Sequence, residues 1–156
     1  MAADAVIDLT LSAPQVVQSA RDRFNEGRTR PLRFRKKQLN GLLEFVKENQ
    51  NALLEAMHQD LKKPKQEVMV LEIIPFVKDV EHVLNHLDEW AKPEKPRKAM
   101  VNWMDGVMVY NDPYGVVLVM GAWNYPLQLT MTPAIGERGL GRFKVRETEV
   151  IFDYVY

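Results

Sequence analysis

The sequence predicts an α/β protein, and three observations support that prediction. Residues 116–120 form an unbroken apolar run rich in β-branched side chains, which is typical of a strand covered on both faces. Before that run, apolar residues recur at helical spacing through most of residues 12–90. After it come Gly121, where the backbone can turn sharply or approach a ligand closely, and a loop that leads into a helix. Ligands of open α/β sheets bind at this end of a strand.

Composition narrows the class of protein. The chain has 156 residues, enough for one domain with a real core, and its 21 basic and 21 acidic residues cancel. A zero net charge gives no general attraction to nucleic acid or to acidic lipid. The absence of cysteine excludes disulfides, thiolate nucleophiles and cysteine-bound metals. Residues 1–8 have no basic leader, and no apolar run is long enough for a membrane span, so we expect a soluble cytoplasmic protein.

The first elements are predicted from their ends. Residues 1–11 read as a loose tail. Ser12 is a good helix cap, Pro14 suits the first turn, and Gly27 can end the helix that they begin. A basic, proline-broken link then leads into a second helix, predicted at about 31–48 from its apolar stripe.

Two further helices complete a helical layer. A short helix is predicted to carry the apolar residues of 53–61, and a long one to span roughly 66–90. Pro75 lies inside the long pattern, so we expect a kink or a break there. Together these segments predict an N-terminal helical layer over residues 12–98, which ends in a charged, proline-containing linker at 91–98.

The remaining residues favour strands. Residues 99–103 and 107–111 are short strand candidates, and Asp105-Gly106 between them is a hairpin signal, so a hairpin is predicted over 99–111. Residues 112–136 hold the apolar strand, its loop and a helix start near Leu127. The end of the chain, 142–156, alternates and is rich in β formers, which fits either an edge strand or an unpaired, sticky tail.

His82 and His86 have the i, i+4 spacing of two zinc ligands on a helix. The metalloprotease motif needs a glutamate directly after the first histidine, and here that position is Val83. A third ligand does not stand out in the sequence. We therefore interpret both histidines as surface or helix-packing residues and predict no metal site.

Two other patterns resemble ligand sites only in part. Residues 136–141, GERGLG, are as rich in glycine as a phosphate loop but lack its order of residues, so we predict a flexible break. The basic residues of 28–37 could meet phosphates, but acids elsewhere balance them and only Phe34 is interleaved. A solvated helix face is the better interpretation.

The loop after the apolar strand carries the candidate chemistry. A structural interpretation, in which a polar loop caps the strand with Trp123 as core filler, accounts for Trp123 and Tyr125. It explains Asn124 less well, because a carboxamide at a strand end can donate a hydrogen bond to a developing oxyanion. Loops at strand ends are where sites lie, and the pattern alone leaves both interpretations open.

Residues 112–136, DPYGVVLVMGAWNYPLQLTMTPAIG, closely resemble the early core of the aldehyde dehydrogenase superfamily. The Trp-Asn-Tyr-Pro sequence is most similar to the class 3, or fatty-aldehyde, branch. The resemblance covers about 14–136, an ordered series of motifs over most of the chain. Upstream segments that agree with it are 16–21, 24–32, 53–61 with Lys63, and 84–90.

The resemblance implies an incomplete Rossmann-like region, made of the helical layer, the hairpin and the first parallel strand. Enzymes of the family oxidise aldehydes to carboxylic acids with NAD or NADP, using a cysteine thiolate and a glutamate-activated water. By position, Asn124 resembles the oxyanion-hole side chain. Ala122 and Trp123 would line the nicotinamide end, and Tyr125 and Leu129 would face the aldehyde tunnel.

The departures from the family pattern begin after Gly136. The strand that holds the cofactor ribose, the later glycines of the dinucleotide site, the general-base glutamate and the cysteine nucleophile have no counterpart, and 137–156 is a tail outside the family pattern. We therefore expect a truncated chain that is inactive alone and binds the dinucleotide weakly or not at all.

Two other functions stay open. In the family, the region before Asp112 contributes strands to subunit contacts, so the 99–111 hairpin could let this chain pair with a full-length subunit as a non-catalytic partner. A self-contained helical domain with an unrelated binding role is the other alternative. Against it, the apolar strand 116–120 needs neighbouring strands, and an exposed one predicts aggregation.

Overall fold

A computed structural model describes residues 12–97, 100, 104, 106–110, 115–136 and, for the backbone alone, 148–154. The predicted loose tail at 1–11 and most of the glycine-rich break lie outside these residues. The elements in chain order are α1 (Ala13–Asn25), α2 (Leu32–Glu48), α3 (Gln50–Leu61), α4 (Lys65–Val68), the π-helical turn η1 (Met69–Ile73), α5 (Ile74–Trp90), β1 (Gly115–Gly121), α6 (Pro126–Ala134) and β2 (Thr148–Tyr154).

The first two helices begin and end at the signals in the sequence. The backbone N–H of Ser12 donates a hydrogen bond to the Gln15 Oε1 atom at 2.8 Å, so the side chain three residues on closes the start of α1. Gly27 follows the helix with φ +71°, in the left-handed region that favours glycine. Pro31 then occupies the cap position of α2, one residue before the helix.

The long helical segment is interrupted where Pro75 predicts an interruption. The π-helical turn η1 joins α4 to α5, and Pro75 is the second residue of α5. Proline has no N–H to donate to the carbonyl four residues back, and its ring crowds that carbonyl. A wider π turn just before the proline accommodates the crowded carbonyl, and such turns are frequent at functional sites.

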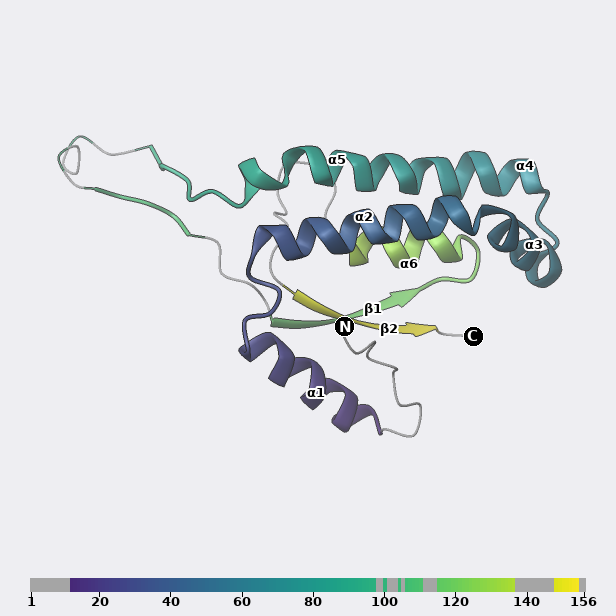
Figure 1. Ribbon diagram of the computed structural model, residues 1–156, viewed down its shortest axis with the longest axis horizontal. Coiled ribbons are helices and arrows are strands. Elements are labelled where there is room, and N and C mark those ends of the chain that lie inside the picture. Colours follow the sequence, from purple (N-terminus) through teal and green to yellow (C-terminus); the bar gives the residue numbers. More distant parts are fainter. Residues whose placement is uncertain are drawn as a thin grey trace.

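The two strands form a parallel pair with Gly115 opposite Thr148 and Gly121 opposite Tyr154. Of the two interpretations of the chain end, the backbone of 148–154 is therefore that of an edge strand. Helices α2, α5 and α6 lie on one side of the pair and α1 on the other (Figure 1). This is an α/β arrangement with an incomplete sheet.

The expectation that β1 is covered on both faces is wrong. Val119 is buried toward α6, but Leu118 and Met120, on the opposite face, are 52% and 61% exposed. Helix α1 contacts β1, with Phe24 beside Gly115 at the start of the strand, but Leu118 and Met120 stay exposed. An apolar run shows what a strand is suited to bury, and here one half of one face is left uncovered.

The segment after α5 forms an arm that projects from the helical layer (Figure 1). Glu94 and Val109 exchange backbone hydrogen bonds of 2.9 and 2.8 Å as an isolated antiparallel bridge. The second strand candidate therefore contacts the linker 91–98. Most of the first candidate, 99–103, lies outside the described residues, so the hairpin over 99–111 stays a prediction.

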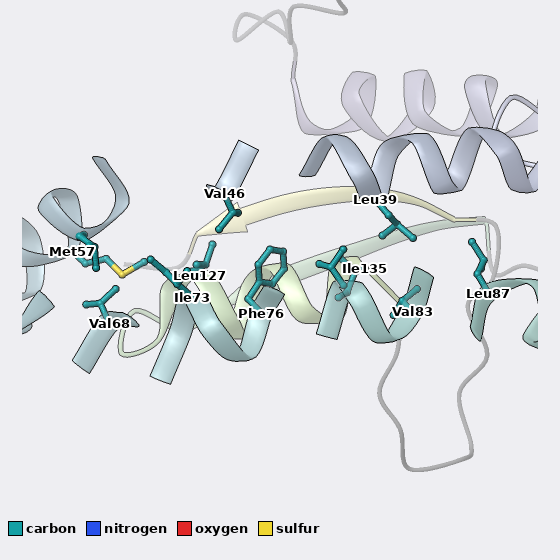
Figure 2. Close-up of a cluster of buried hydrophobic side chains, with 12 residues drawn as sticks. Leu39, Val46, Met57, Val68, Ile73, Phe76, Val83, Leu87, Leu127 and Ile135 are labelled. Atoms are coloured by element: carbon teal, nitrogen blue, oxygen red, sulfur yellow. The ribbon is translucent and has the colours of Figure 1, made fainter. Parts of the chain in front are cut away.

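The core lies between α2, α5 and α6. Phe76 is fully buried in the middle of the cluster, with Val46 of α2 and Leu127 of α6 among its neighbours (Figure 2). Fully buried residues of α5 extend the core along the helix: Val80, Val83 and Leu87. Burial of this apolar area is the main stabilising contribution, and it fixes α6 against the helical layer.

Candidate functional site

The candidate site is the loop 122–125, between the carboxyl end of β1 and the start of α6. The loop directly follows Gly121, the last residue of β1, which is buried against α6. A Cβ atom on Gly121 would lie 1.7 Å from the Thr130 Oγ1 atom, so only glycine fits there. From the sequence, Gly121 allows either a sharp turn or the close approach of a ligand; in the structure its close neighbour is Thr130 of α6. The strand end and the helix are thereby held in direct contact.

The other end of the loop is held by a distant carboxylate. Tyr125 occupies the cap position of α6 and makes no capping hydrogen bond, and Pro126 has no N–H. The Leu127 N–H donates to the Glu72 Oε2 atom at 3.0 Å. Glu72 lies on the π-helical turn and is fully buried. It therefore takes the place of a local capping side chain, and its negative charge suits the helix amino terminus.

Lys63 completes this cluster. Its Nζ atom lies 2.7 Å from the Glu72 Oε1 atom, and the lysine side chain is 12% exposed. The same Nζ atom lies 3.8 Å from the centre of the Tyr125 ring, within the range of a cation–π contact. The buried carboxylate thus has both a counter-charge and a backbone donor, as a buried ion needs.

The sequence alone indicates no role for Glu72, and Lys63 enters only through the family resemblance. A signal for Glu72 was present: the acid interrupts the apolar face of its helical segment, at i, i+3 spacing from Met69 and next to Ile73. An acid on an otherwise apolar stripe is a buried charge that needs a partner. The partner could not be read from the sequence, since Leu127 lies 55 residues away.

The five predicted site residues lie together in one strand–loop–helix unit. Ala122, Trp123 and Asn124 are exposed, with Trp123 at 68%. Tyr125 is half-buried beside Lys63, and Leu129 follows on the first turn of α6 with 41% of its surface exposed. The Asn124 carboxamide is therefore accessible at the carboxyl end of β1, where a ligand of an α/β sheet would bind.

Comparisons with known proteins agree on one family. The sequence model described as "Aldehyde dehydrogenase family" matches residues 10–136. The chain belongs to the aldehyde dehydrogenase family. It is 37% identical over 127 residues to the dimeric NADP-preferring aldehyde dehydrogenase of Canis lupus familiaris, covering 81% of this chain. It is 40% identical over 125 residues to aldehyde dehydrogenase family 3 member B1 of Rattus norvegicus, covering 80% of this chain.

A solved structure of the aldehyde dehydrogenase family has the same fold. The substrate-bound state of Staphylococcus aureus AldH superposes with a TM-score of 0.78 at 25% identity, over 91% of this chain. The resemblance to the family, its class 3 relatives and the incomplete Rossmann-like fold are thus confirmed. This chain spans 28% and 27% of the length of the dog and rat relatives, and 30% of the Staphylococcus chain.

The histidine pair and the basic segment singled out in the sequence both make aromatic ring contacts in this aldehyde dehydrogenase segment. The rings of His82 and His86 lie 4.2 Å apart, and that of His86 stacks on Trp90 at 5.3 Å, all along α5. Within the described part of the chain, no three potential ligands are grouped to hold a metal ion. In the basic segment, the Arg28 guanidinium lies 5.5 Å from the Phe34 ring centre.

Among the helices that the structure describes, none is both long and apolar enough to cross a membrane.

Proposed function

We propose that this chain carries the oxyanion-binding segment of an NAD(P)-dependent aldehyde dehydrogenase and is inactive on its own. The observation that supports it is the exposed Asn124 carboxamide at the carboxyl end of β1, in a loop held at both ends. Family membership supplies the reaction, the oxidation of an aldehyde to a carboxylic acid. The cytoplasmic location expected from the sequence stays a prediction.

Asn124 would act when a thiolate attacks the aldehyde. A carbon–sulfur bond forms, and the π electron pair of the carbonyl moves to oxygen. The Asn124 Nδ2 group would donate a hydrogen bond to that oxyanion, which stabilises the transition state more than the neutral carbonyl. Tyr125 and Leu129 would contact the apolar part of the aldehyde. The thiolate must come from elsewhere, because this chain has no cysteine.

The residues fit only one end of the dinucleotide. NAD or NADP, when bound, would accept the hydride, and the exposed Ala122 and Trp123 suit the flat nicotinamide ring. The start of α6 does not suit the pyrophosphate, since Pro126 has no N–H and the Leu127 N–H is taken by the Glu72 carboxylate. Weak or no dinucleotide binding is therefore expected of this chain alone.

The test has two parts. The purified chain, mixed with aldehyde and NAD or NADP, is expected to form no reduced cofactor above the uncatalysed rate. A chimera in which residues 12–136 replace the matching segment of the dog enzyme is expected to be active. In that chimera, Asn124→Ala should lower kcat by about 10²–10³-fold, as for other oxyanion donors.

Asn85→Ala is the matched control, since Asn85 is exposed on α5, outside the candidate site. Turnover by the purified chain would refute the inactivity. A chimera whose kcat is unchanged by Asn124→Ala would refute the oxyanion role.

A second candidate function is pairing with a full-length subunit. The arm after α5 exposes large apolar side chains away from the core: Met100 at 96%, Met104 at 89% and Tyr110 at 69%. Such a surface is typical of a contact site. Co-expression with a tagged full-length class 3 enzyme should then co-purify this chain, and failure to co-purify would count against the role.

A further inference from the structure

We propose that Glu72, paired with Lys63, is a positioning residue that holds the Asn124 loop in its working orientation. The inference rests on the proposed function in one respect, because it takes Asn124 as the oxyanion donor. Asn124 is exposed, so its direction depends on the backbone on either side of it. The contacts at the two ends of the loop are therefore the ones that matter.

At the first end, strand and helix are already fixed. The Thr130 Oγ1 atom occupies the space that a Cβ on Gly121 would need, and Thr130 is fully buried. This contact sets the distance between the end of β1 and the second turn of α6. This contact does not fix the path that the backbone of the loop 122–125 takes from β1 to α6.

At the second end, the Glu72 carboxylate fixes the path of the loop backbone from β1 to α6. Since Tyr125 provides no side-chain cap, the Leu127 N–H would otherwise be buried without an acceptor. The 3.0 Å hydrogen bond to the Glu72 Oε2 atom fixes the second residue of α6 against the π-helical turn. A charge-assisted bond of this kind is stronger and more directional than a neutral one.

Lys63 links the Glu72 carboxylate to Tyr125, the residue next to Asn124. Its Nζ atom neutralises Glu72 at 2.7 Å and lies over the Tyr125 ring at 3.8 Å. The ring is therefore restrained by the same ion pair that caps the helix. Glu72, Lys63 and Tyr125 therefore act together. Asn124, which directly precedes Tyr125, is held in place by them.

The test is NMR spectroscopy of the whole 156-residue chain. In the wild type, the Lys63 ε-methylene protons should be displaced to high field by the Tyr125 ring, and the Leu127 amide should exchange slowly. Glu72→Gln should abolish that displacement and speed Leu127 exchange by about tenfold relative to the Val80 amide of α5. The Asn124 backbone amide should gain fast motion, seen as a lower heteronuclear NOE.

Two comparisons separate positioning from general stability. Glu55→Gln breaks an exposed glutamate–lysine pair of similar length, 3.0 Å to Lys65, and should leave the loop signals unchanged. Lys63→Arg keeps the charge and the cation–π contact and should retain an ordered loop. If Glu72→Gln does not fold, the double variant Lys63→Met/Glu72→Gln removes both buried charges and keeps an acceptor for Leu127.

The proposal is overturned if Glu72→Gln, or in its place the double variant, folds with wild-type signals at Asn124 and Tyr125. It is also overturned if the wild-type Lys63 protons show no ring-current displacement, which decides the matter even where no variant folds. The proposed function is tested separately, because the kcat of the chimera with Asn124→Ala shows whether Asn124 is the oxyanion donor. Loop order does not depend on that result.

Discussion

Gly121 and Thr130 lie so close together that position 121 has no room for any side chain. A Cβ there would be 1.7 Å from the Thr130 Oγ1 atom and 2.8 Å from its Cβ. The two residues belong to the strand and the helix on either side of the candidate loop, and Thr130 is fully buried. The contact therefore ties the geometry of the site to the packing of α6 on β1.

Gly121→Ala should destabilise the chain. The overlap is with a buried side chain that cannot move aside, so the cost should be about 3 kcal/mol of unfolding free energy, the upper end for overpacked interiors. Urea denaturation followed by circular dichroism measures it. Gly41→Ala is the matched control. Gly41 lies in α2 with nothing within 4 Å of a Cβ, and alanine should raise stability by about 0.5–1 kcal/mol.

Phe76→Ala should cost about 3–5 kcal/mol, because the ring is fully buried in the core and its loss leaves a cavity. Phe45→Ala removes the same ring from a position that is 50% exposed and should cost under about 1 kcal/mol. Thermal melts of both variants provide the comparison. Equal losses would mean that the helical layer does not form one cooperative core.

The helices could be predicted from the sequence because their signals are local. Ser12 and Gln15 lie three residues apart, Gly27 directly follows its helix, and Pro75 comes just after the irregular turn. The strand at 115–121 could be predicted from its own apolar run. None of these predictions depends on which residues pack against the element from elsewhere in the chain.

The cap on α6 could not be predicted because it joins distant residues. Glu72 and Leu127 are 55 positions apart, and a sequence does not show which buried donor will meet which buried acid. The exposure of Leu118 and Met120 was missed for a related reason. A pattern of apolar residues describes the strand, whereas burial depends on the layers that surround it. The arm likewise pairs Val109 with Glu94 of the linker, a contact that the sequence does not show.

Glu55 should titrate below the ordinary range of a glutamate. The hydrogen bond from Lys65 lowers the pKa of the Glu55 carboxyl most, followed by the hydrogen bond from Gln59 and the charge of Lys65. Because the pKa is depressed in the folded state, the stabilising effect is present at neutral pH and is lost as the pH falls through the folded pKa. The group is fully exposed, so the effect on stability is small.

An NMR titration of the Glu55 side-chain carbon measures this pKa directly. Lys65→Met should raise the pKa toward its ordinary value, whereas Lys47→Met, at an exposed position on α2, should not. A pKa that stays unchanged in Lys65→Met would mean that the ion pair does not form in solution.

The uncovered face of β1 should make the chain associate with itself. Leu118 and Met120 lie side by side on that face, 52% and 61% exposed, and exposed apolar strand surface drives association. The double variant Leu118→Lys/Met120→Lys should shift the chain toward monomer in sedimentation velocity while the midpoint of its thermal melt hardly changes. Charges on the open face cost little, because those side chains bury little on folding.

Val119→Lys separates this effect from unfolding. Val119 points to the opposite face and is buried against α6, so an ammonium group there should abolish the cooperative melt and increase aggregation. If the double lysine variant associates as strongly as the wild type, the contact between copies lies elsewhere, and the exposed arm with Met100 and Met104 becomes the surface to vary next. If it becomes monomeric, the uncovered face of β1 is the contact between copies.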